Sequence, residues 1–195
     1  ELDRPCGELV GRALEAGLDF VHENCPTPRK HLIETMPGGV AVFDYDGDGR
    51  LDVYVVTGAE LSPTRQRIPH RNALFRNLGG WRFEDVSAKA GVDLAAWGQG
   101  VCAGDADGDG RLDLYVTNWG ANTLFRNNGD GTFEDWTERA GVGDPRWSVG
   151  AVFFDPDGDG DEDLFVGNYI ETNWDEVWTA QRVRLWRGRV KVLDG

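Results

Sequence analysis

Short apolar runs alternate along this chain with blocks of aspartate and glycine. The runs that precede three of these blocks span residues 40–43, 101–103 and 151–154, and those that follow span residues 51–56, 112–116 and 163–166. Each run is rich in β-branched or aromatic side chains and is bounded by turn residues, which is typical of a strand. The pattern therefore predicts three pairs of strands, each pair joined by an acidic turn.

A longer motif follows the first two of these pairs. It spans residues 72–92 and returns at residues 122–142, and both copies begin Asn-x-Leu-Phe-Arg-Asn and end Ala-Gly-Val. Glycine-rich turns at residues 77–80 and 127–131 divide each copy into two strands, which is a strong signal of a β-hairpin. The Ala-Gly-Val ends predict a brief helical turn that closes the unit.

One strand before the acidic turn, one after it and the hairpin together give a unit of four strands. Four-stranded units of about 50 residues have the size of propeller blades. We therefore predict an all-β fold of β-propeller-like blades, each with four antiparallel strands, in a single domain over residues 1–195. Its expected parts are a lead-in at residues 1–38, a first blade at 39–92, a second blade at 100–142 and a partial third blade at 149–195.

Two stretches depart from this repeat. The first unit carries an insertion that includes residues 62–69, and we expect a surface loop there. The third unit lacks the Leu-Phe-Arg-Asn hairpin and continues into a basic run at residues 182–191. Arginine alternates there with valine, leucine and tryptophan, which favours a strand with one charged face. That strand is either a plain surface strand, the interpretation we favour, or a contact for an acidic partner.

The three acidic turns share one nonapeptide pattern. They span residues 44–52 (the first loop), 105–113 (the second loop) and 155–163 (the third loop), with carboxylates at positions 1, 3, 5 and 9 and glycines at positions 4 and 6. Carboxylates at this density repel one another, so a compact loop needs a cation at its centre. Hard oxygen ligands at alternating spacing, with glycines that allow tight coiling, favour Ca²⁺, about one ion per loop.

The candidate ligands are the side chains at positions 1, 3, 5 and 9 and the backbone carbonyl at position 7. They are Asp44, Asp46, Asp48, Arg50 and Asp52, then Asp105, Asp107, Asp109, Arg111 and Asp113, and finally Asp155, Asp157, Asp159, Asp161 and Asp163. An EF-hand is excluded because its loop needs glutamate at position 12 and lies between helices, whereas position 12 here is valine and the flanks predict strands. The alternatives are a solvated turn without an ion, and ions with a purely structural role, which we favour.

With these loops and hairpins the chain resembles FG-GAP/VCBS repeat proteins. It is most similar to the family that includes the cartilage acidic proteins and bacterial proteins with a C-terminal ASPIC/UnbV domain, and residues 17–23, 33–40 and 167–175 also match that family's motifs. The resemblance implies secreted β-propeller blades with Ca²⁺ in the inter-strand loops, held by the aspartates at positions 1, 3, 5 and 9. Members of that family carry a long insertion where the third unit departs from the repeat.

The net charge and the cysteine content limit the partners and the cellular location that we expect for the protein. The net charge of −14 argues against nucleic acid and anionic membranes as partners. No apolar stretch is long enough for membrane insertion, and low-affinity calcium loops are useful where calcium is millimolar, so we expect a secreted, extracellular or periplasmic protein. Cys6 and Cys25 can form a disulfide, Cys102 is most simply a small buried hydrophobe, and the odd count leaves an intermolecular bridge open.

No residue pattern suggests catalysis or a zinc site, so we do not expect an enzyme. Trp97 and Trp147 each precede an acidic loop by eight residues, which favours packing in the blades over a carbohydrate-stacking platform. The leading hypothesis is a secreted, calcium-stabilised scaffold for binding or adhesion, with a protein or carbohydrate ligand. The alternatives are a structural subunit of a head-to-tail extracellular filament, which self-associates through open blade edges, and an accessory module of a larger secreted enzyme.

Overall fold

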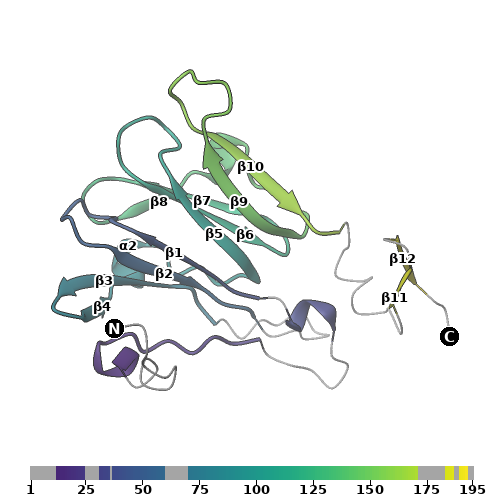
Figure 1. Cartoon of the computed structure of the whole chain (residues 1–195), viewed down its shortest axis with the longest axis horizontal. Coiled ribbons are helices and arrows are strands. Elements are labelled where there is room, and N and C mark those ends of the chain that lie inside the picture. Colours follow the sequence, from purple (N-terminus) through teal and green to yellow (C-terminus); the bar gives the residue numbers. More distant parts are fainter. Residues whose placement is uncertain are drawn as a thin grey trace, which may run out of the picture.

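Two four-stranded antiparallel sheets and a two-stranded sheet stand side by side in this computed structural model (Figure 1). The structure describes residues 12–24, 31–35, 37–59, 70–170, 183–186 and 189–192. The first sheet contains β1 (Gly39–Phe43), β2 (Asp52–Val56), β3 (Ala73–Gly79) and β4 (Arg82–Asp85). The second sheet contains β5 (Gly98–Gly104), β6 (Asp113–Asn118), β7 (Thr123–Asn127) and β8 (Phe133–Asp135). The third sheet contains β9 (Ser148–Phe154) and β10 (Asp163–Asn168). The predicted all-β, blade-like fold is confirmed, and the described sheets do not close into a ring.

The two four-stranded sheets end in the same way. A short helix follows each of them, α2 (Ser87–Ala90) after the first sheet and α3 (Thr137–Ala140) after the second. Both helices end at a glycine in the left-handed conformation, with φ of 77° at Gly91 and 69° at Gly141, which a residue without a side chain adopts at little cost. The predicted helical turns are therefore confirmed. A further short element, the 3₁₀ helix η1 (Leu32–Thr35), precedes the first sheet.

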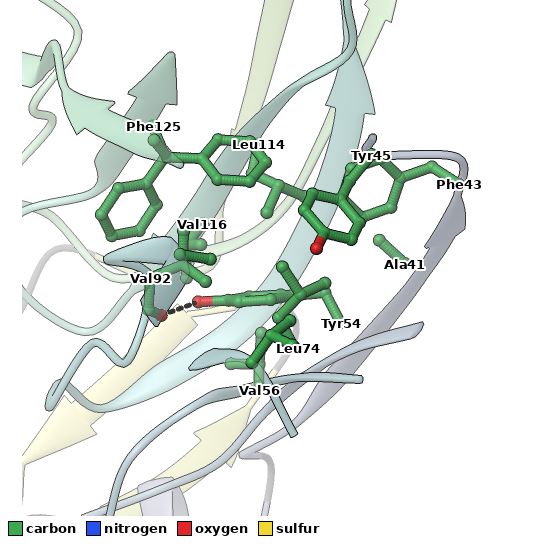
Figure 2. Close-up of a cluster of buried hydrophobic side chains, with 13 residues drawn as sticks. Ala41, Phe43, Tyr45, Tyr54, Val56, Leu74, Val92, Leu114, Val116 and Phe125 are labelled. Carbon is green, nitrogen blue, oxygen red and sulfur yellow. Dashed lines mark hydrogen bonds between the residues drawn. The ribbon is translucent and has the colours of Figure 1, made fainter. Parts of the chain in front are cut away.

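The main core lies between the first and second sheets (Figure 2). Along β1, Ala41 and Phe43 are buried whereas Val40 and Val42 are exposed, as expected where one face of a strand packs and the other does not. The buried set continues with Tyr54, Val56 and Leu74 of the first sheet, Val92 after α2, and Leu114, Val116 and Phe125 of the second sheet. Burying these apolar side chains is the main force that holds the two sheets together.

The first strands of the three sheets, β1, β5 and β9, run next to one another (Figure 1). A Cβ atom added at Gly39 would lie 2.8 Å from the Cα of Gly100, and one added at Gly100 would lie 2.9 Å from the carbonyl oxygen of Val149. Only glycine leaves room for backbones this close. At the equivalent position of the third sheet, Gly150, an added Cβ would meet no heavy atom within 4 Å.

A second, smaller core contains Trp97 and Trp147 together with Ile33 and Ala59. The two tryptophans are 3% and 1% exposed, so the prediction that they pack within the blades is confirmed. Trp119 lies between them, with its ring centroid 6.2 Å from that of Trp97 and 6.4 Å from that of Trp147. Trp147 also donates a hydrogen bond of 3.0 Å from Nε1 to the side chain of Gln99, which joins the second and third sheets.

The described part of the lead-in packs against the first sheet. The backbone N–H of Phe83 donates to the carbonyl of Ala16 at 2.6 Å, and that of Gly58 donates to the carbonyl of Glu23 at 3.0 Å. The ring of Phe20 meets that of Phe75 edge-on at 6.4 Å. These contacts extend from the end of β2 to β4, so the lead-in lies along the first sheet.

The basic run forms a hairpin, and the prediction of a single strand was wrong. β11 (Val183–Trp186) pairs antiparallel with β12 (Arg189–Val192). Charged and apolar residues alternate over most of this run, but the alternation breaks at Leu185 and Trp186, where the first strand ends. Cys6, Cys25 and most of the insertion after β2 lie outside the described residues. Within the described part, no helix has the length and apolar character needed to span a membrane.

Candidate metal centres

Each acidic loop is folded around the aspartate at its first position. Asp44 accepts hydrogen bonds from the backbone N–H groups of Asp48, at 3.1 Å, and Gly49, at 2.8 Å. Asp105 has the same two partners in the second loop, and Asp155 accepts two such bonds in the third. The glycines at positions 4 and 6 all have φ between 72° and 94°, which lets the chain coil tightly around that carboxylate.

This coiling gathers carboxylates in every loop. The ligand atoms lie within 4.8 Å of one another in three groups, which are Asp44, Asp46 and Asp48, then Asp105, Asp107 and Asp113, and then Asp155, Asp157 and Asp159. Positions 1 and 3 belong to all three groups. The third member is position 5 in the first and third loops and position 9 in the second. The structure thus brings most of the predicted side-chain ligands together, whereas Asp52, Asp109 and Asp163 are not members of these groups.

In each of the first two loops, the ninth-position aspartate forms hydrogen bonds with the loop and with the third strand of its sheet. Asp52 accepts hydrogen bonds from the backbone N–H groups of Tyr45, at 3.1 Å, and Asn77, at 2.7 Å. Asp113 accepts the equivalent pair from Ala106 and Asn127, at 2.9 and 2.7 Å. Burial raises the pKa of Asp113 to about 6 and raises that of Asp52, although the two N–H groups act in the opposite direction.

The seventh position is organised from its backbone. The N–H groups of Arg50, Arg111 and Asp161 each donate at 3.0 Å to the fifth-position carboxylate of their own loop. The side chains of Arg50 and Arg111 fold back onto that same carboxylate as ion pairs. The proposed role of their backbone carbonyls as metal ligands stays a prediction.

Two arginines that the sequence did not single out reach the loops from the neighbouring strands. Arg76 of β3 contacts Asp46 and Asp48, with Nη2 to Oδ2 distances of 2.7 and 3.3 Å. Arg126 of β7 pairs through Nε with Asp107 and through Nη2 with Asp109, the latter at 3.0 Å. Both belong to the repeated Leu-Phe-Arg-Asn motif, so the repeat itself was the available signal.

The third-position carboxylates show that these loops suit a cation. The Oδ1 atoms of Asp46 and Asp107 are buried and accept no hydrogen bond from the described residues. A buried carboxylate oxygen without a partner is costly, and a cation offsets that cost. Because every ligand atom in these groups is a carboxylate oxygen, the donor set fits a hard divalent ion such as Ca²⁺.

The loops are also joined to the neighbouring sheets, which sequence reasoning did not foresee. Asn127 Nδ2 donates to the carbonyl oxygen of Tyr45 at 2.8 Å, which links the first loop to β7. The backbone N–H of Asp105 donates to Glu162 Oε2 at 2.8 Å, which links the second loop to the third. The arrangement of the loops therefore depends on how the sheets pack.

Comparison with known proteins agrees with this arrangement. The family described as FG-GAP-like repeat matches the chain twice, over residues 44–116 and 107–166. Each match begins within one acidic loop and continues through the next acidic loop into the strand that follows it, which is β6 for the first match and β10 for the second. A search of curated proteins found no match to the chain.

Proposed function

The chain belongs to the FG-GAP-like repeat family, and we propose that it is a calcium-stabilised scaffold for binding or adhesion that works outside the cell. The calcium would be held by the aspartates gathered in the three loops, with Asp52 and Asp163 completing the first and third sets. The ions would have a structural role, because each loop joins the first two strands of a sheet and its aspartates fix the turn.

The observation that carries this proposal is the pair of buried, unpartnered oxygens at Asp46 and Asp107. They occupy the same position in two loops, so they are a repeated feature rather than a local accident. Ca²⁺ accepts six to eight oxygen ligands in flexible geometry, whereas Mg²⁺ demands a near-ideal octahedron. An irregular group of carboxylates in a glycine-rich loop favours the larger ion.

Binding and adhesion are favoured because repeat sheets of this kind present broad surfaces, and FG-GAP-like repeats are binding modules of that type. The ligand would be a protein or a carbohydrate. We further propose a relationship to the cartilage acidic proteins and the ASPIC/UnbV-type proteins, on the motifs named above. We do not expect catalysis by this chain.

Calorimetry and thermal melting test the calcium proposal. We expect the melting temperature in millimolar Ca²⁺ to exceed that in chelator, because a ligand that binds only the folded state stabilises it by mass action. Mg²⁺ at the same concentration is the matched control and should give a smaller shift. Replacing Asp46 and Asp107 with asparagine should reduce the calcium-dependent part of the shift. A melting temperature that is the same in chelator and in Ca²⁺ would refute the proposal.

Self-association is a second candidate, and the outer faces of the sheets favour it. Val40 and Val42 are 60% and 57% exposed on the face of β1 that points away from the second sheet. On the third sheet, Val152 and Phe165 form an exposed cross-strand pair. Val101 and Ala103 occupy the equivalent positions in the second sheet, and they pack against the core between the first and second sheets. A second copy of the chain would cover Val40 and Val42 in the same way. Sedimentation at increasing concentration tests this; a monomer throughout would exclude it.

A further inference from the structure

Within the part of the chain that the structure describes, an arginine from a neighbouring strand pairs with the carboxylates of the first and second acidic loops, whereas none pairs with those of the third. Arg76 and Arg126 each contact the third- and fifth-position carboxylates of the neighbouring loop. Because they occupy the same place in β3 and β7, the two sheets repeat this contact. The guanidinium of Arg126 also lies over the ring of Trp136, whose centroid is 4.7 Å from the guanidinium carbon.

The arginine and a metal ion would use different oxygens of the same carboxylates. Arg76 contacts the Oδ2 atoms of Asp46 and Asp48, and Arg126 those of Asp107 and Asp109. The Oδ1 atoms of Asp46 and Asp107 stay buried and unpartnered among the described residues. The guanidinium therefore neutralises part of the charge from outside the loop and leaves the inner oxygens for a ligand.

The third loop has the same acidic spacing, and among the described residues it lacks this support. Its seventh position is Asp161 where the other loops have arginine. Asp155, Asp157 and Asp159 are all exposed, and no lysine or arginine side chain of the described residues pairs with them. As far as the described residues go, their mutual repulsion is therefore reduced by backbone N–H groups and by solvent alone.

We propose that Arg76 and Arg126 are positioning residues that keep the first and second loops folded when calcium is withdrawn, so that the third loop alone depends on the ion for its order. This inference rests on the proposed calcium binding. A fixed guanidinium lowers the repulsion within a group of carboxylates whether or not a metal is present. Calcium withdrawal then loosens only the loop that has no such group.

Hydrogen exchange of the full chain, read by mass spectrometry, tests this loop by loop. The reporters are backbone N–H groups bonded to carboxylates, such as those of Asp109 and Gly110 in the second loop and Asp159 and Gly160 in the third. On moving from Ca²⁺ to chelator, exchange in the third loop should accelerate by about tenfold or more, and exchange in the first and second loops by less than about threefold.

The variant Arg126→Met removes the guanidinium and retains a long side chain. Although Arg111 still pairs with Asp109, this variant should make the second loop respond to chelator more strongly than in the wild type, toward the response of the third loop, while the first loop, with Arg76 intact, is the control within the same molecule. Arg126→Lys keeps a charge without the planar fork and should restore part of the protection. Exchange in β5 and β6 reports whether the variant is folded, and Arg76→Met gives the mirror-image test if it is not.

The outcomes separate this inference from the proposed function. If all three wild-type loops lose protection to the same degree in chelator, calcium binding stands and the role of the arginines is refuted. If Arg126→Met folds and its second loop still resists chelator, the inference is also refuted. If no loop responds to chelator, the proposed calcium binding itself fails.

Discussion

Tyr45 of the first acidic loop stacks on Phe133 of β8, with ring centroids 6.2 Å apart and an interplanar angle of 24°. Tyr45 occupies the second position of the loop, where the other loops have Ala106 and Pro156. The contact joins the first loop to the second sheet, and both rings are almost fully buried. The loop therefore contributes to the packing between sheets as well as to the candidate metal centre.

Replacing Tyr45 with alanine should destabilise the protein by about 3 kcal/mol, because it removes a buried ring between two sheets and leaves a cavity. Tyr45→Phe keeps the stacked ring and should cost less than about 1 kcal/mol. Urea denaturation followed by tryptophan fluorescence measures both variants. Equal losses for the two variants would show that the ring contact is not what matters at this position.

The close approach of the first strands predicts a graded response to alanine at equivalent positions. At Gly39 and Gly100 an added methyl would lie under 3 Å from backbone atoms, which cannot move aside cheaply. Gly39→Ala and Gly100→Ala should therefore each cost about 2 kcal/mol or more, the range of overpacking in a close-packed interior.

Gly150→Ala is the matched control, because nothing lies within 4 Å of its added Cβ. This variant should change the stability by less than about 0.5 kcal/mol. Thermal melting in chelator and in Ca²⁺ compares the three variants. If Gly150→Ala is as damaging as the other two, the sheets do not approach one another in the way that the structure shows.

The hydrogen bonds of the ninth-position aspartates predict that replacing these residues destabilises the protein more in the first two loops than in the third. Asp52 and Asp113 each accept two backbone N–H groups from different segments, and asparagine offers only one carboxamide oxygen for them. Asp52→Asn or Asp113→Asn should cost about 1–3 kcal/mol, because a buried N–H group loses its acceptor. Asp163→Asn, at an exposed position, should cost less than either when all are measured in chelator, where metal binding makes no contribution.

Much of the fold could be predicted from the sequence because its signals are local. Strand, acidic turn, strand and hairpin follow one another in the chain, and each is marked by alternation or by turn residues within a few positions. The stacking of one sheet on the next also follows from the repeat, since a blade buries its faces only against neighbours. The hairpin at β11 and β12 was missed because the basic run was treated as one alternating strand, although the alternation breaks at Leu185 and Trp186.

The candidate site was predictable only in part. The aspartates of each loop are neighbours in sequence, so their spacing alone indicates a metal centre. Arg126 and Asp107, by contrast, meet because β7 pairs with β6, and Asn127 reaches Tyr45 across the boundary between two sheets. Contacts of this kind depend on strand register and on sheet packing, which the residues themselves do not specify.

The pair of Asp144 and Arg146 predicts a dependence of stability on pH. Arg146 donates to both oxygens of Asp144, at 2.9 Å from Nε to Oδ1 and 2.6 Å from Nη2 to Oδ2, and Asn168 donates to Oδ2 at 3.0 Å. These bonds hold the pKa of Asp144 well below its usual range. A carboxyl group whose pKa is lowered on folding contributes stability above its unfolded pKa of about 3.9, and that stability is lost as the pH falls.

Asp144→Asn should therefore lower the free energy of unfolding by about 1 kcal/mol at pH 7, a modest value because Arg146 is largely exposed. The difference from the wild type should shrink as the pH falls below about 4, because the wild-type carboxyl group then becomes protonated as well. Glu138→Gln, an exposed change on α3, is the matched control and should behave like the wild type across the range. Denaturation at a series of pH values measures all three proteins. A deficit for Asp144→Asn that stays constant down to pH values of about 2 would show that the charge of Asp144 is not the source of its stabilising effect.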